Sequence, residues 1–118
     1  MLDLLIDKND IEIKNKINQE LDFLKFNSSH KGTTYLCETI YEIYLQKNIN
    51  VKLNTNIYPI IAKKYNTTIN NIKIAIFRAS LNSYYDCEEE KLSTYTGKKI
   101  INKPTTLETI RAILKHIE

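Results

Sequence analysis

Turn-forming residues are scarce in this chain, and that scarcity limits the folds open to it. Glycine and proline occur only twice each among 118 residues. β-Sandwiches and barrels need many tight turns, which rely on these two residues for their backbone geometry. The composition therefore favours helices joined by a few polar connections. A chain of this length corresponds to one domain, so we treat residues 1–118 as a single unit.

Apolar residues that recur every three or four positions predict about six helices and no strand, an all-α fold. Polar residues beside these periodic segments mark where helices should begin. They are the Asn9–Glu12 capping box before a helix to about Phe26, Thr33 or Thr34 before a helix to about Asn48, the Asp86–Glu89 pair before a helix near residues 88–94, and the Thr105–Glu108 box after Pro104.

The middle of the chain carries the most informative pattern. Residues 58–65 form a short predicted helix with Pro59 in its first turn, where a missing N–H has no consequence. Asn66, Thr67 and Thr68 then end that helix and offer two capping hydroxyls to a helix from Ile69 to about residue 84. A short helix, a three-residue turn and a longer helix are typical of a helix-turn-helix. Helical hairpins without DNA-binding activity share this pattern, so both interpretations stay open on spacing alone.

Positive charge is concentrated in the same part of the chain. The net charge is only +3, but residues 31–85 hold seven basic residues against Glu38 and Glu42. The flanking segments 1–30 and 86–118 carry no positive excess. This distribution fits a surface that faces a polyanion such as DNA, and it also fits lysines that only solvate helix faces.

Catalytic and metal-binding patterns are not evident. His30 and His116 are the only imidazoles, and neither has an obvious nucleophile beside it. Cys37 and Cys87 match no metal-ligand spacing and are expected to be reduced thiols. We therefore expect no enzyme, no metal and no cofactor. The apolar N-terminal run is too short for an export signal or a membrane span, which predicts a cytoplasmic protein.

Four strings along the chain together resemble one known family. They are His30-Lys31-Gly32 followed by Tyr35-Leu36-x-Glu38-x-Ile40, then Ile57-Tyr58-Pro59-x-Ile61-Ala62-Lys63-Lys64-Tyr65-Asn66-Thr67-Thr68, then Ile72-x-x-Ala75-Ile76-x-x-Ala79, and Lys103-Pro104-Thr105. In this order they resemble the C-terminal effector domain of the master response regulator that initiates sporulation. The resemblance covers residues 10–118, and the second string is its most specific part.

The resemblance implies a six-helix domain whose helix-turn-helix reads the major groove of promoter DNA, often as two copies on tandem sites. In that family a phosphorylatable receiver domain precedes the effector. Here the resemblance begins about ten residues after Met1, so we expect a stand-alone effector without a receiver. Its partner is expected to be double-stranded DNA, with self-association on tandem sites or a protein partner as further expectations.

Carried over position by position, the resemblance also implies a set of DNA-contacting residues. The groove-facing residues are expected to be Ile69, Asn70, Asn71, Lys73, Ile74, Phe77 and Arg78, and the phosphate contacts Thr67, Thr68, Lys63, Lys64 and Lys103. The family has arginine at the positions of Asn71, Ile74 and Phe77, and this chain therefore lacks three of the family's contacts. Arginine is the usual bidentate partner of guanine, whereas apolar side chains contact thymine methyl groups. We expect an altered, A·T-leaning specificity.

The same helix face supports a second hypothesis. Ile74, Phe77 and Leu81 are spaced by three and four residues and form an apolar stripe on the side that the fold should expose. Exposed apolar stripes often mark protein interfaces. The chain would then be a regulator that binds a protein partner or itself without reading DNA. If the register is slightly different, these residues belong to the core instead.

Overall fold

The computed structural model describes residues 2–47, 50–99 and 102–117, and in these ranges the chain contains six α-helices and no strand. The helices are α1 (Leu2–Phe23), α2 (Lys31–Gln46), α3 (Tyr58–Lys64), α4 (Ile69–Asp86), α5 (Glu89–Thr96) and α6 (Thr106–Ile117), and a π-helical turn, η1 (Leu53–Ile57), precedes α3. The predicted all-α fold with a helix-turn-helix in the middle is confirmed.

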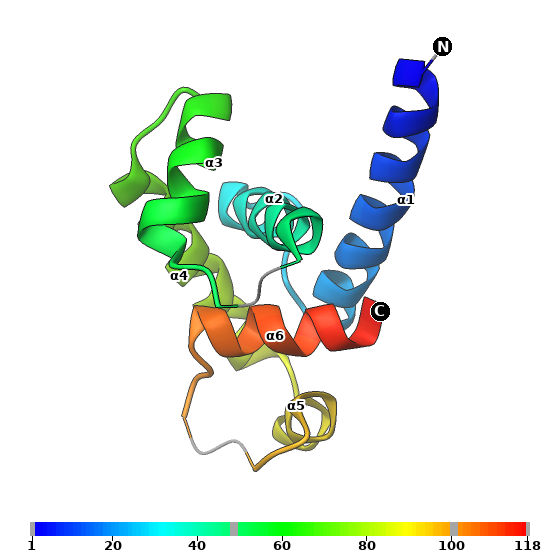
Figure 1. Ribbon diagram of the computed structural model, residues 1–118. Coiled ribbons are helices and arrows are strands. Elements are labelled where there is room, and N and C mark those ends of the chain that lie inside the picture. The colour runs from blue at the N-terminus through cyan, green and yellow to red at the C-terminus, as the bar shows by residue number, and fades with distance from the viewer. Residues whose placement is uncertain (1, 48–49, 100–101, 118) are drawn as a thin grey trace.

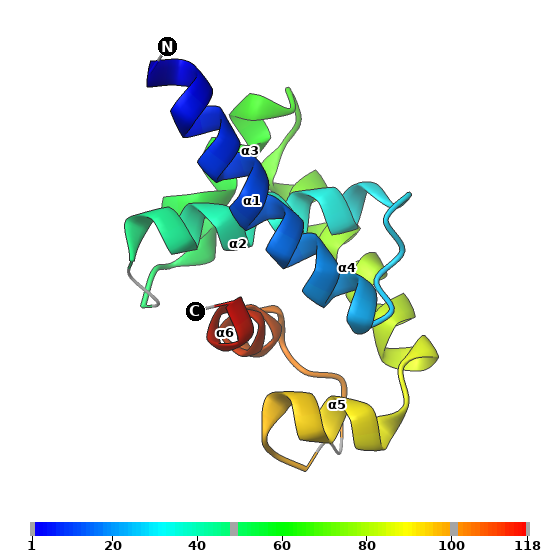
Figure 2. The same ribbon diagram turned by 90° about the vertical axis from the view of Figure 1, so that its right-hand side faces the viewer.

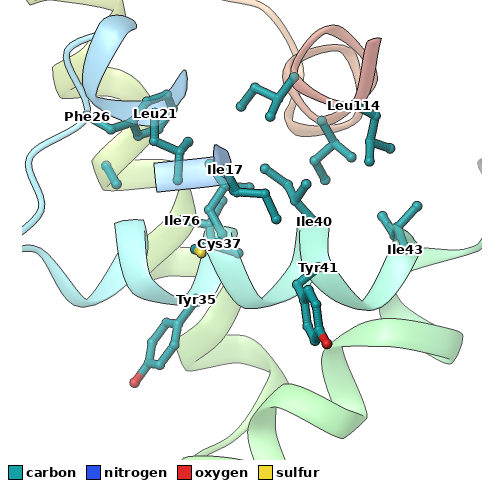
Figure 3. Packing of buried hydrophobic residues seen from close by; sticks show 14 of the residues in the cluster. Ile17, Leu21, Phe26, Tyr35, Cys37, Ile40, Tyr41, Ile43, Ile76 and Leu114 are labelled. Carbon is teal, nitrogen blue, oxygen red and sulfur yellow. The ribbon is translucent and has the colours of Figure 1, made fainter. Parts of the chain in front are cut away.

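Helix α2 lies at the centre of the domain. Figure 1 shows α1 on one side of α2 and the α3–α4 pair on the other, and Figure 2 shows α6 crossing beneath it. Leu36 and Ile40 of α2 are fully buried, and Figure 3 shows Ile17 of α1, Ile76 of α4 and Leu114 of α6 gathered around this helix. Because α1, α3, α4 and α6 all pack on it, α2 is buried on most of its circumference.

The capping residues predicted for three of the six helices, α1, α2 and α5, are wrong. Asn9 and Glu12 lie inside α1, which begins at Leu2 because no residue before Asn9 interrupts the helix. Helix α2 begins at Lys31, with His30 as its N-cap and without a side-chain cap, so neither Thr33 nor Thr34 caps it. The predicted end of this helix, at Asn48, lies outside the described residues. Asp86 is the last residue of α4, and Glu88 precedes α5.

The predicted start of the last helix is confirmed in detail. The backbone N–H of Thr105 donates to Glu108 Oε1 at 2.9 Å, and the backbone N–H of Glu108 donates to Thr105 Oγ1 at 3.1 Å. This reciprocal pair is a capping box, and it satisfies two backbone donors that have no intrahelical partner. It differs from the failed boxes because Pro104 stops any helix from continuing upstream through this point.

Helices α2 and α4 approach each other closely at Gly32. A Cβ atom on Gly32 would lie 1.9 Å from the carbonyl oxygen of Ala75 and 2.9 Å from Ala79 Cβ. Only a residue without a side chain allows the first turn of α2 to cross α4 at this distance. The small side chains of Ala75 and Ala79 complete the contact, so the sequence of both helices sets the crossing.

Replacing Gly32 with alanine is therefore expected to destabilise the protein. Alanine favours a helix over glycine by about 1 kcal/mol, but overpacking against a backbone carbonyl typically costs about 1–3 kcal/mol and occasionally more. Because the overlapped oxygen belongs to the backbone and cannot rotate away, we expect a cost at the upper end of this range. The net loss in the free energy of unfolding, measured by urea denaturation, should then be about 2 kcal/mol. Thr34→Ala, at an exposed position of the same turn, is the control and should leave stability almost unchanged. A Gly32→Ala variant as stable as the wild type would contradict this packing.

Candidate nucleic-acid interface

The predicted helix-turn-helix is formed by α3, α4 and the four residues between them. At the end of α3, Thr67 N–H donates to the Ala62 carbonyl at 2.9 Å and Asn66 N–H to the Lys63 carbonyl at 3.3 Å. Asn66 has a left-handed φ of 52°. These two bonds and the left-handed residue form a Schellman motif, which ends a helix and turns the chain sharply.

The start of α4 is capped as the sequence predicted. Thr68 is extended, and its side-chain oxygen accepts a hydrogen bond from the backbone N–H of Asn71 at 3.1 Å. The side chain of Asn71 is bound locally as well, because its Nδ2 donates to Thr67 Oγ1 at 3.1 Å. Thr67 and Thr68 therefore hold the turn rigidly, which fixes the direction in which α4 leaves it.

Helix α4 presents one face to the core and the opposite face to solvent. Ile72, Ile76 and Ala79 are buried against the rest of the domain. On the outer face, Ile74 is 41% exposed and Phe77 is 53% exposed, so neither is a core residue. The alternative register, in which this stripe belongs to the core, is wrong for both side chains.

Most of the predicted groove-facing residues share that outer face. The exposed members are Asn70, Asn71, Lys73, Ile74, Phe77 and Arg78. Ile69 is an exception, because it is partly buried and packs against the hydrophobic core. Leu81 of the apolar stripe is also only partly exposed. The exposed apolar part of the stripe is therefore Ile74 and Phe77.

Lys64, predicted as a phosphate contact, is already paired with a buried carboxylate. Lys64 Nζ lies 2.9 Å from Glu38 Oε2, and Lys14 Nζ lies 3.1 Å from Glu38 Oε1. The Tyr65 hydroxyl also donates to Glu38 Oε1, at 3.4 Å. Glu38 on α2 thus joins α1 to the end of α3. Lys63, the neighbouring residue, is exposed and has no acidic partner among the described residues.

Glu38 is a structural residue that the sequence interpretation missed. Its side chain is only 10% exposed, and two ammonium groups compensate its charge. The available signal was an acidic residue among the apolar residues Leu36, Cys37 and Ile40. A carboxylate buried at such a position needs a partner, because buried charges are almost always paired. Sequence spacing does not identify the partners, because Lys14 and Lys64 lie on two other helices.

Lys103, also predicted as a phosphate contact, packs against α4. Its Nζ lies 4.9 Å from the centre of the Phe77 ring, a cation–π distance, and it donates a hydrogen bond to the Pro104 carbonyl at 3.3 Å. Burial lowers the pKa of this ammonium group below its ordinary value. Lys103 therefore places a positive charge beside the exposed aromatic side chain of α4.

The electrostatics of this region favour an anion. From Tyr58 to Tyr85 the chain has four basic residues and no acidic one.

His116, one of the two histidines of the chain, packs against an aromatic side chain. Its ring stacks on Tyr95 with 3.8 Å between ring centres, and its Nε2 lies 3.1 Å from the Tyr95 carbonyl. This histidine has a packing role between α5 and α6. In the described ranges, no three His, Cys, Asp or Glu side chains are grouped as metal ligands.

Comparison with known proteins agrees with this geometry. Residues 17–117 match the family described as "Sporulation initiation factor Spo0A C terminal". The chain belongs to this family. Spo0A C-terminal domains are DNA-binding effector domains of transcription regulation in sporulation, and the α3–α4 unit of the chain lies wholly within the matched range. None of the curated proteins compared matches the chain. No helix within the described ranges is long and apolar enough to cross a membrane.

The pairing of Glu38 predicts a pH-dependent contribution to stability. Burial alone would raise the pKa of Glu38, but hydrogen bonds from Lys64 and Lys14 outweigh it and hold the pKa below its ordinary value. The contribution is therefore present above the pKa of an unfolded glutamate, about 4.3, and is lost as pH falls through the lowered folded-state value. Glu38→Gln should remove about 1.5–3 kcal/mol at neutral pH, the usual range for hydrogen bonds to a charged group.

Urea denaturation of the wild type and Glu38→Gln between pH 3 and pH 7 measures this effect. The difference between the two proteins should shrink toward acid pH, because protonation neutralises the same carboxylate. Glu90→Gln, exposed on α5 and without an ion-pair partner among the described residues, is the control. A difference that stays constant with pH would exclude this role for the Glu38 charge.

Proposed function

We propose that this protein is a DNA-binding transcriptional regulator whose recognition helix, α4, has a sequence specificity different from that of its family. The observation that carries the proposal is the outer face of α4, which has the position of a reading surface and an altered composition. It presents Asn70, Asn71 and Lys73 in its first turns, followed by two exposed apolar side chains and Arg78. We further propose a cytoplasmic protein without enzymatic activity.

The chemistry of this face favours A·T-containing sites. Asparagine can pair with the N6 and N7 atoms of adenine, and the exposed Ile74 and Phe77 side chains can contact thymine methyl groups. Arg78 is the one arginine of α4 and can form a bidentate pair with guanine. Because Asn71 is hydrogen-bonded to Thr67, Asn70 is the freer of the two asparagines for a base contact.

Phosphate contacts orient a domain on DNA without specifying sequence. Of the predicted set, Lys63 is the most available, being exposed and without an acidic partner among the described residues. The ammonium group of Lys64 is paired with Glu38, which reduces its attraction to a phosphate. The ammonium group of Lys103 lies over the Phe77 ring, so it would contact DNA beside that aromatic side chain. Thr67 and Thr68 act mainly through the turn, where their hydroxyls are already acceptors. We therefore propose that Lys63 makes the strongest phosphate contact of the five.

Fluorescence anisotropy tests DNA binding directly. The protein is titrated onto an A·T-rich duplex, a random-sequence duplex and the DNA site of the family, each across a salt series. We expect affinity that falls steeply with salt, preference for the A·T-rich duplex and weak binding to the family's site. Absence of binding at low salt would overturn the proposal.

Replacing Arg78 with alanine tests base readout. The variant should lose the preference for guanine at the base pair that Arg78 contacts, by about 1–3 kcal/mol, the range for a bidentate base contact. Arg111→Ala is the matched control, because Arg111 is the only other arginine of the chain and lies exposed on α6. Equal preference in the wild type and the Arg78→Ala variant would exclude a base contact by this residue.

A second candidate function has one observation in its favour. Ile74 and Phe77 are exposed apolar side chains on one helix face, as in protein interfaces. In this alternative the protein binds a protein partner or itself through the stripe and does not read DNA. Sedimentation of the wild type and Phe77→Ser separates the two: a wild-type dimer that Phe77→Ser dissociates favours the alternative, and a monomer that binds DNA favours the first proposal.

A further inference from the structure

A cavity of about 420 Å³ lies between the start of α2 and the outer part of α4. One wall is formed by the segment that leads into α2, with His30 and Lys31. The other wall is formed by Arg78 and Asn82 of α4. Apart from Arg78, the groove-facing and phosphate-contacting sets described above include none of these residues.

The lining of this cavity suits an anion. Lys31 and Arg78 each carry a positive charge, and His30 and Asn82 add side chains that can donate hydrogen bonds. None of the residues that line the cavity is acidic, and neither Lys31 nor Arg78 has an ion-pair partner within the described ranges. These two cations, Lys31 and Arg78, therefore give the cavity a preference for a negatively charged ligand.

The packing of Gly32 explains why these groups meet. Because the first turn of α2 lies directly on Ala75 and Ala79, Lys31 is brought to the same side of α4 as Arg78 and Asn82. Arg78 and Asn82 are one helical turn apart, and they follow Asn71 and Ile74 along the outer part of α4. The cavity thus lies at the flank of the face proposed to enter the major groove.

We propose that this cavity binds a phosphate group, with Lys31 and His30 on one side and Arg78 on the other. The inference rests on the proposed function in one respect: in a DNA complex, the phosphate would belong to the backbone that borders the groove occupied by α4. Arg78 has five N–H donors, so it can reach this phosphate and a neighbouring base edge together. The ligand chemistry is the same for a free phosphate ion, and the experiments below separate the two sources.

The first experiment compares Lys31→Gln with Lys47→Gln on DNA. Both lysines are exposed, and Lys47 follows the opposite end of α2, about 24 Å away at 1.5 Å per residue. For Lys31→Gln we expect affinity to fall about threefold to tenfold on every duplex, without a change in preference, and the salt slope to decrease by about 0.9. His30→Gln should act in the same direction. If DNA binds, Lys31→Gln behaves like Lys47→Gln, and the phosphate titration described next shifts none of the cavity signals, the inference is overturned.

The second experiment uses inorganic phosphate in place of DNA. Backbone amide signals of the ¹⁵N-labelled protein are followed during a phosphate titration at constant ionic strength, with chloride as the reference salt. We expect signals of residues 30–32 and of Arg78 to shift in the wild type, and the shifts to be lost in Lys31→Gln and kept in Lys47→Gln.

The two experiments distinguish failure of this inference from failure of the proposed function. If the wild type does not bind DNA but phosphate shifts these signals, the cavity is a site for free phosphate and the DNA-binding proposal fails alone. If DNA binds and Lys31→Gln weakens it uniformly, the phosphate belongs to the DNA backbone. If neither DNA nor phosphate binds, the inference is overturned together with the proposed function.

Discussion

The close crossing of α2 and α4 at Gly32 is the constraint on which the rest of the structure depends. Helix α2 is the central element of the core, and α4 carries the outer face that is proposed to read DNA. A side chain at position 32 would overlap the Ala75 carbonyl, so the absence of one sets the distance between these two helices. The cavity beside Lys31 and Arg78 is a consequence of the same contact, because it forms where the two helices meet.

Buried electrostatics set which surface charges remain available. Glu38 is held by Lys14 and Lys64, and this joins the first helix of the helix-turn-helix to the core. The arrangement removes Lys64 from the uncompensated positive charges and leaves Lys63 and Lys73 exposed beside the turn and α4. A count of lysines therefore overstates the charge that a polyanion would meet. The position of each ammonium group relative to Glu38 decides its availability.

The outer face of α4 combines features that separate specificity from affinity. Ile74 and Phe77 replace charged contacts that the family resemblance implies, and apolar side chains contribute little to the salt-dependent attraction to DNA. Lys63 and Lys103, the cations beside this face, are proposed to compensate in part, and Lys103 lies over the Phe77 ring. If the proposed phosphate contacts lie beside this face, a change of base preference need not abolish the attraction to DNA.

Composition and local spacing were sufficient for the helices, the turn between residues 65 and 68 and the Thr105–Glu108 cap, since these depend on interactions within a few residues. The predicted caps failed at Asn9, because no residue before it ends the helix, and at Asp86, because the preceding helix extends through that residue. The outward positions of Asn70, Lys73, Ile74, Phe77 and Arg78 followed from helical periodicity, whereas Ile69 turned toward the core. The pairing of Lys64 with Glu38, the contact of Lys103 with Phe77 and the cavity beside Lys31 join residues from different elements. Only the tertiary structure decided them, because helix periodicity carries no information about which helices pack together.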